Sequence, residues 1–254
     1  MCLILFAYEM HRDHRLILGA NRDEFYERPT APLDWWEDHP TVLAGRDLRG
    51  GGTWMGISRT GKLAGITNFR DPAGLKNNAP SRGALVSDFL CGDEPARSYL
   101  EKVHLASEVY NGFNLILGDA TGLFYYSNYQ NEIHQLTPGI YGLSNRFIDS
   151  PWPKVETGKA HLTKLIQQGT VDDESIFNLL KNRQQPLEDQ LPDTGVGMEW
   201  ERILSPLFIH SDIYGTRSSS VIRMGKEGRI QFSERTFENH ETGCQSAETR
   251  LFEF

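Results

Sequence analysis

The stretch MCLILFAYEMHRDHRLILGAN, residues 1–21, joins two apolar runs through a short charged turn. Cys2–Tyr8 and Arg15–Asn21 are each long enough for a strand and His11–His14 supplies the turn, so the stretch predicts a β-hairpin. Cys2 heads the first strand, directly behind Met1. Because cysteine is small enough for methionine aminopeptidase to remove Met1, the mature chain would begin with a residue that carries both a thiol and a free α-amine.

An N-terminal cysteine combines two chemical functions in one residue. A thiol is a strong nucleophile only as the thiolate, and an α-amine titrates at about pH 8, so the amine can accept the thiol proton at neutral pH. Cys2 would then supply both nucleophile and base. The alternative is an inert strand cysteine, because free cysteine is among the most buried residue types.

The composition is that of an ordinary soluble globular protein, with 39% hydrophobic and 24% charged residues in a chain of 254. A net charge of -8 argues against a nucleic-acid partner, because phosphate binding needs a basic surface. Cys2, Cys91 and Cys244 are too few and too scattered for a disulfide framework, which suggests a reducing compartment. The short N-terminal apolar run does not match a signal peptide, and no stretch is long enough to span a membrane. We therefore expect a cytoplasmic protein without an integral membrane segment.

Beyond the first hairpin, the apolar patterns predict further strands and helices. Strands are expected at Thr53–Ser58, Leu63–Asn68, Phe113–Leu117, Gly122–Ser127, Glu132–Leu136, Gly139–Ser144, Ser218–Met224 and Arg229–Phe237. Helices are expected at Ser81–Leu90, Glu94–Ser107, Lys154–Gln168 and Asp173–Asn182. Ser81 is the expected N-cap of the first helix and Gly92 its stop, while Arg28–Pro40 and Gln184–Met198 are expected to be loops.

The order of these elements predicts an α+β protein with antiparallel sheets. Strand-rich blocks alternate with pairs of helices, and the four strands between residues 113 and 144 are expected to form a meander. Helix pairs between sets of strands fit two stacked sheets with helices outside them. We find no internal repeat and no clear domain boundary, so residues 1–254 are interpreted as a single domain.

Several polar residues at predicted strand ends are candidates for a site around Cys2. Asp23 follows the strand that pairs with Cys2, so its carboxylate could hold and orient the protonated α-amine. Asn68 and Asn145 each end an apolar strand, and an Asn amide can donate to the oxyanion that forms when a carbonyl is attacked. Arg217 begins a strand and could tune the thiol or bind a substrate carboxylate. Solvated turns, capping asparagines and a surface salt bridge are the alternatives.

The sequence contains no recognisable nucleotide or metal motif. Gly50–Gly52 lacks the Gly-Lys-Ser/Thr of a phosphate-binding loop and does not open a helix. The eight histidines are scattered, and no cysteine or carboxylate set completes a metal site with His11 and His14. A histidine could still ligate haem iron, although no Cys-x-x-Cys-His occurs.

Asn21-Arg22-Asp23-Glu24, some twenty residues behind Cys2, resembles the motif of the Asn-Arg-Asp-Glu (NRDE) family, also called transport and Golgi organisation two. The resemblance covers nearly the whole chain. It is carried by Met1–Leu3, Ala20–Pro29, Gly50–Trp54, Gly65–Arg70, Gly142–Asn145 and Tyr214–Arg217.

That family in turn resembles the N-terminal nucleophile hydrolases of the penicillin V acylase and bile salt hydrolase type. The resemblance implies a four-layer αββα sandwich and, as catalytic residues, Cys2, Asp23, Asn68, Asn145 and, more loosely, Arg217. We also predict ligand contacts within or beside the family motifs, at Asn21, Arg22, Trp54, Arg70 and Arg146.

One departure from those acylases concerns an arginine. They carry it three residues before the aspartate, where this chain has Ala20. Arg22 adjoins Asp23 and would point to the opposite face of the strand, so it need not substitute.

Two functions follow from the resemblance. The first is hydrolysis of a non-peptide amide bond by Cys2, for which no cofactor is required. The second is a non-catalytic carrier of haem or of a hydrophobic, acyl-lipid ligand on the same scaffold, because family members have been linked to haem mobilisation and to lipid homeostasis.

Overall fold

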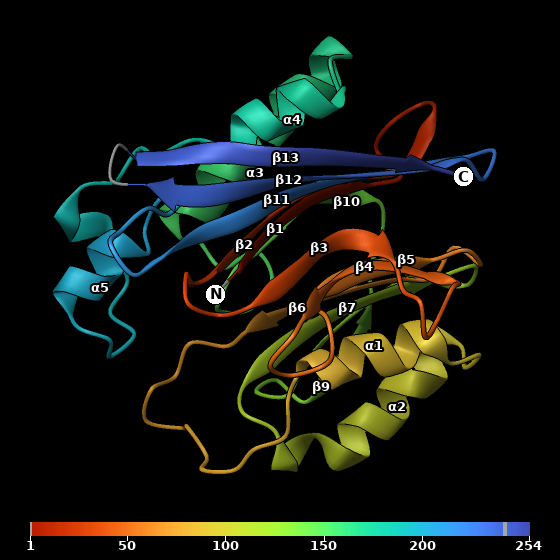
Figure 1. Ribbon diagram of the computed structural model, residues 1–254, viewed down its shortest axis with the longest axis horizontal. Coiled ribbons are helices and arrows are strands. Elements are labelled where there is room, and N and C mark those ends of the chain that lie inside the picture. The colour runs from red at the N-terminus through yellow and green to blue at the C-terminus, as the bar shows by residue number, and fades with distance from the viewer. Residues whose placement is uncertain (1, 241–242) are drawn as a thin grey trace. The chain divides into compact units, whose positions relative to one another are not determined.

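The computed structural model describes residues 2–240 and 243–254, and its helices and strands fall into two compact units. The first unit comprises Met1–Glu27 and Pro138–Phe254, and the second comprises Arg28–Thr137. Each unit contains one antiparallel sheet with helices on one of its faces (Figure 1).

The sheet of the first unit has six strands in the order β10-β1-β2-β11-β12-β13. The strands are β1 (Cys2–Tyr8), β2 (His14–Phe25), β10 (Gly139–Leu143), β11 (Tyr214–Gly225), β12 (Ile230–His240) and β13 (Gly243–Glu253). The helices of this unit are α3 (Pro153–Gln168), α4 (Asp173–Leu180) and the short α5 (Met198–Ile203), with a 3-10 turn at Glu188–Gln190. β1 therefore lies inside the sheet, between β10 and β2.

Alternate residues of β1 face opposite sides of this sheet, and every one of its side chains is buried. Leu3 and Leu5 pack with Val155 and Leu162 of α3 in one apolar cluster. The close approach of α3 requires glycine at position 158, where an added Cβ would lie 2.6 Å from Leu5 Cδ1. Cys2 belongs to the other face, where Phe6 stacks on Tyr141 of β10.

The sheet of the second unit has seven strands in chain order, from β3 to β9. They are β3 (Thr30–Trp35), β4 (Val42–Asp47), β5 (Met55–Ser58), β6 (Leu63–Asn68), β7 (Phe113–Asp119), β8 (Gly122–Ser127) and β9 (Glu132–Gln135). Between β6 and β7 the chain forms α1 (Gly83–Cys91), α2 (Ala96–Ala106) and a 3-10 turn at Ser107–Val109.

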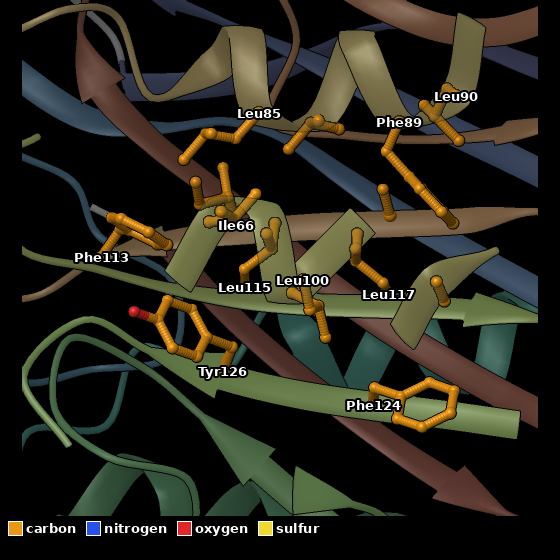
Figure 2. Packing of buried hydrophobic residues seen from close by; sticks show 14 of the residues in the cluster. Ile66, Leu85, Phe89, Leu90, Leu100, Phe113, Leu115, Leu117, Phe124 and Tyr126 are labelled. Atoms are coloured by element: carbon orange, nitrogen blue, oxygen red, sulfur yellow. The ribbon is translucent and has the colours of Figure 1, made fainter. Parts of the chain in front are cut away.

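The core of the second unit lies between its helices and its sheet (Figure 2). Leu85 and Phe89 of α1 and Leu100 of α2 pack into one cluster with Ile66 of β6 and Leu115 of β7. Burial of each such side chain is worth about 1.5–3 kcal/mol, so this cluster accounts for much of the stability of the unit.

Most predicted elements are confirmed, but the expected loop at Arg28–Pro40 is wrong, because it contains β3. Pro32 and a bulge between Ala31 and Asp34 interrupt the strand pattern. Both are tolerated because β3 is an edge strand. β4, α5 and the edge strand β13 were also not expected from the sequence.

Two details of the predicted elements are corrected. The expected four-strand meander stops after β9, because the fourth strand, β10, pairs with β1 in the first unit. Ser81 is not the N-cap of α1; that position is Arg82, which makes no side-chain capping hydrogen bond. Gly92 does end the helix, as expected.

Candidate functional site

Cys2 lies at the end of β1, where three chain segments of the first unit meet. The antiparallel register aligns Cys2 with Arg22 of β2 and Ile4 with Leu143 of β10. The segment that follows Leu143 therefore runs beside Cys2. Ser144 Oγ lies 3.3 Å from the carbonyl oxygen of Cys2 and 3.2 Å from Oδ1 of Asn145, and its single hydroxyl proton can be donated to either.

Cys2 is buried, with 8% of the residue exposed. Burial raises its pKa, and the negative charge of Asp23 acts in the same direction, whereas the positive charge of Arg22 and a hydrogen bond from the Asp23 backbone oppose the shift. A thiol with a raised pKa is protonated at neutral pH. Cys2 therefore needs a base before it can act as a nucleophile.

Asp23 is 1% exposed and lies on the face of the sheet opposite to that of Cys2 and Arg22. Its Oδ1 accepts a 2.7 Å hydrogen bond from Thr216 Oγ1, and its backbone carbonyl accepts one of 2.8 Å from the Tyr214 hydroxyl. Burial raises the pKa of Asp23 to about 6, and the charge of Lys154 is the strongest influence in the other direction. The carboxylate is thus mostly ionised at pH 7.

Lys154 is a residue of this region that the sequence analysis missed. It is 4% exposed, in the first turn of α3, and its Nζ donates a 3.0 Å hydrogen bond to the carbonyl oxygen of Leu204. A positive charge is unfavourable near a helix N-terminus. The sequence therefore did contain a signal for a special role of Lys154. It is a lysine directly after Pro153, at a predicted helix start.

Arg22 is 6% exposed, and the expectation that it points away from the face of Asp23 is confirmed by the pairing of Arg22 with Cys2 and of Asp23 with Thr216. Its Nη1 is buried and has no hydrogen-bond partner among the described residues. The guanidinium charge therefore lies on the Cys2 side of the sheet.

Arg217 occupies a bulge in β11, between the residues that pair with Asp23 and Arg22. Its Nη1 donates to the carbonyl oxygens of Phe25 at 3.1 Å and Tyr26 at 3.0 Å. Burial lowers the pKa of Arg217, and the charge of Arg22 lowers it further. The two guanidinium groups are therefore near enough to repel each other.

Asn21 is completely buried on the helix-facing side of the sheet. Its Nδ2 donates to the carbonyl oxygens of Leu180 at 3.0 Å and Leu207 at 2.8 Å, and its Oδ1 accepts from Ser219 Oγ at 2.6 Å. These bonds tie β2 to α4 and to the segment after α5. These hydrogen bonds give the buried Asn21 side chain a structural role. Its predicted ligand contact stays a prediction.

Three of the remaining predicted site residues, Asn68, Trp54 and Arg70, lie in the second unit, and the fourth, Arg146, lies in the first. Asn68 ends β6 opposite Phe113, Trp54 packs on the core of the second unit, and Arg70 is buried in that unit. Arg146, in the first unit, is exposed, with its guanidinium carbon 5.2 Å from the ring centre of Phe147. The oxyanion role of Asn68 and the ligand contacts of Trp54, Arg70 and Arg146 stay predictions.

Within residues 2–240 and 243–254, no group of three His, Cys, Asp or Glu side chains is arranged to hold a metal ion. Every helix there falls short of the length and apolar character that a membrane crossing needs. Binding of haem or of a hydrophobic ligand stays a prediction.

The fold is similar to that of a Caenorhabditis elegans orthologue of N-acylethanolamine-hydrolyzing acid amidase, with a TM-score of 0.51 over 87% of this chain and 92% of the other, at 10% identity. This likeness confirms the predicted α+β fold class. The penicillin V acylase of Agrobacterium tumefaciens aligns at a TM-score of 0.40 and 12% identity, and the assignment does not depend on it.

Sequence comparison identifies nearer relatives. The transport and Golgi organization protein 2 homologue of Bos taurus is 38% identical over 93% of both chains, and that of Homo sapiens is 36% identical over 100% of this chain and 99% of its own. The family model described as Transport and Golgi organisation 2 matches residues 1–239. This chain therefore belongs to the transport and Golgi organisation 2 family.

Proposed function

We propose that the protein hydrolyses a non-peptide amide C–N bond and that Cys2, exposed as the N-terminal residue by removal of Met1, is the nucleophile. The observation that carries the proposal is the convergence at the end of β1. Cys2 pairs there with Arg22, its carbonyl lies beside Ser144, and its thiol accepts a hydrogen bond from the backbone of Asp23.

In the proposed reaction, the α-amine of Cys2 accepts the thiol proton and the sulfur attacks the amide carbonyl carbon, so that a C–S bond forms as the carbonyl π electrons move to oxygen. The Asn145 amide donates to this oxyanion. When the oxyanion collapses, the C–N bond breaks and the ammonium returns its proton to the leaving nitrogen. A water deprotonated by the same amine then cleaves the thioester, which releases a carboxylic acid and the free thiol.

In this proposal Asp23 orients the α-ammonium rather than reacting with the substrate. The hydrogen bond from Thr216 to Oδ1 holds one carboxylate oxygen, and the charge of Lys154 favours the ionised form. An ionised, fixed carboxylate suits the task of holding an ammonium group. Arg217 adds a second positive charge near that of Arg22 at this strand end.

The reaction class agrees with the printed name of the C. elegans structural neighbour, an amidase. A fold supports many chemistries, so that agreement has less weight than the residues themselves. Loss of a catalytic nucleophile lowers turnover by about 1,000-fold or more, which makes the proposal measurable.

The test compares Cys2→Ala with Cys91→Ala, a matched control at the end of α1 in the second unit. Intact mass reports whether Met1 is absent, and two substrates are assayed: N-lauroylethanolamine and the activated acyl donor p-nitrophenyl laurate. We expect a chain without Met1, turnover by the wild type and Cys91→Ala, and loss of at least about 1,000-fold in Cys2→Ala. Equal turnover by Cys2→Ala and the wild type, or no turnover of either compound, would sink the proposal.

A further inference from the structure

Arg22 is a buried charge to which the proposed reaction assigns no contact with the substrate. Its side chain is on the Cys2 face of the sheet, and Nη1 is enclosed without a hydrogen-bond partner in the described part of the chain. A buried guanidinium without a partner is costly, so its presence calls for an explanation outside packing.

The carboxylates nearest in the chain do not neutralise Arg22 by hydrogen bonding. Asp23 lies on the other face, where Thr216 bonds its Oδ1. Glu24, two residues further along β2, interacts electrostatically with Arg217, whose guanidinium also repels that of Arg22. The guanidinium of Arg217 is therefore a second positive charge near that of Arg22.

A second buried polar atom lies on the same face. Ser218 pairs with Arg22, and Ser220 pairs with the small residue Ala20, so both serines share the face of Arg22. Ser220 Oγ is buried and, within the described residues, also has no hydrogen-bond partner. Arg22 and Ser220 therefore each offer a hydrogen-bond donor without a partner among the described residues. Ala20, which lies on the same face, has only a methyl side chain.

We propose that Arg22 binds a carboxylate of the substrate, so that the preferred substrates are N-acyl amino acids rather than neutral amides. The inference rests on the proposed function of Cys2. The planar guanidinium fork matches a carboxylate in charge and geometry. Because β10 and β2 flank β1, Asn145 and Arg22 lie on opposite sides of Cys2, and the oxyanion and the carboxylate are bound on those two sides.

The experiment uses two amides that differ at one group. N-lauroylglycine has a carboxylate where N-lauroylethanolamine has a neutral hydroxymethyl group. We expect the wild type to have a higher kcat/KM for N-lauroylglycine. Arg22→Gln should lower that value at least about tenfold more than the value for N-lauroylethanolamine. The loss of a charge that favours the Cys2 thiolate acts on both amides alike and does not change this ratio. Arg12→Gln, at an exposed arginine of the β1–β2 turn, is the matched control and should change neither value.

A loss shared equally by both amides would overturn the proposal, because it would show that Arg22 acts on the thiol or the oxyanion. Arg22→Lys keeps the charge and should keep part of the preference for N-lauroylglycine. Removal of an unpartnered buried charge should leave the melting temperature unchanged or higher. Collapse of the fold in Arg22→Gln, together with no preference in Arg22→Lys, would also overturn the proposal.

A binding arm separates this inference from the hydrolysis proposal. In Cys2→Ala, which cannot form the acyl-enzyme, calorimetry should show N-lauroylglycine bound at least about tenfold more tightly than N-lauroylethanolamine. The added substitution Arg22→Gln should abolish that ratio. If no amide is hydrolysed but the ratio is found, the carboxylate site stands and the hydrolysis proposal fails; equal dissociation constants overturn the carboxylate site.

Discussion

At the scale of single residues, burial changes how Asp23 titrates, because its pKa is raised to about 6. An aspartate in an unfolded chain titrates at about 3.9. Between these values the folded chain binds more protons than the unfolded chain. The contribution of Asp23 to the free energy of unfolding is therefore most favourable below about pH 4 and declines as the pH rises through about 6, by up to about 3 kcal/mol.

This titration predicts a pH-dependent difference between the wild type and Asp23→Asn, whose side chain does not ionise. Urea unfolding of both chains at pH 4, 5, 6 and 7 gives the free energy of unfolding of each. We expect the wild-type value minus the variant value to fall steadily from pH 4 to pH 7. A difference that is constant or rises with pH would show that Asp23 is not buried as an unfavourable charge.

Which site residues could be predicted depends on how locally their positions are determined. The hairpin register brings Asp23 near Cys2, and a strand ending at Leu143 brings Asn145 there once β10 pairs with β1. Lys154 approaches Asp23 through helix packing, and Thr216 of β11 is the register partner of Asp23. Such tertiary contacts leave little trace in a local pattern, which is why both residues were missed.

At the scale of elements, Lys62 links the β5–β6 hairpin to the end of α1. Its Nζ donates to the carbonyl oxygens of Gly92 at 2.6 Å, Glu94 at 2.8 Å and Phe89 at 3.4 Å. A cation is favourable at a helix C-terminus, where the last carbonyl groups lack helical partners. One side chain therefore satisfies several carbonyl groups at the point where α1 stops.

Lys62→Met should destabilise the protein by about 1–3 kcal/mol, because it leaves these carbonyl groups without their donor. Urea unfolding measures the change, and Lys226→Met, at an exposed lysine of the β11–β12 turn, is the control. The control should change the unfolding free energy by less than about 0.5 kcal/mol. A Lys62→Met effect no larger than that of the control would mean that water replaces the ammonium at little cost.

Two of the elements that were not expected, β3 and β13, are edge strands with weak apolar alternation. β3 contains Pro32 and a bulge, which only an edge strand accommodates, and β13 is an edge strand whose described side chains are largely exposed. Interior strands such as β1 and β7 are buried along nearly their whole length and were predicted closely. Edge strands need little burial, so their sequences indicate little about their structure.

At the scale of the whole molecule, the two units differ in how far apart in the chain their paired strands are. The first unit joins strands from both ends of the chain, as in the hydrogen bond between Thr216 and Asp23 across 193 positions. In the second unit each strand pairs with the next one along the chain. No local pattern could show that residues 28–137 form a separate unit, inserted in the chain between the two segments of the first unit.

This difference in connectivity predicts the order in which the two sheets form during refolding. Pairing of distant segments is slow because chain entropy is lost before the contact forms, so the second-unit sheet should form first. Pulse-labelling hydrogen exchange after dilution from urea should protect amides of β7, such as Leu115 and Leu117, at least about tenfold sooner than those of β2 and β11, such as Leu18 and Ile222. Protection of Leu18 and Ile222 at the same rate as Leu115 would contradict this order, and would indicate that both sheets form in a single cooperative step.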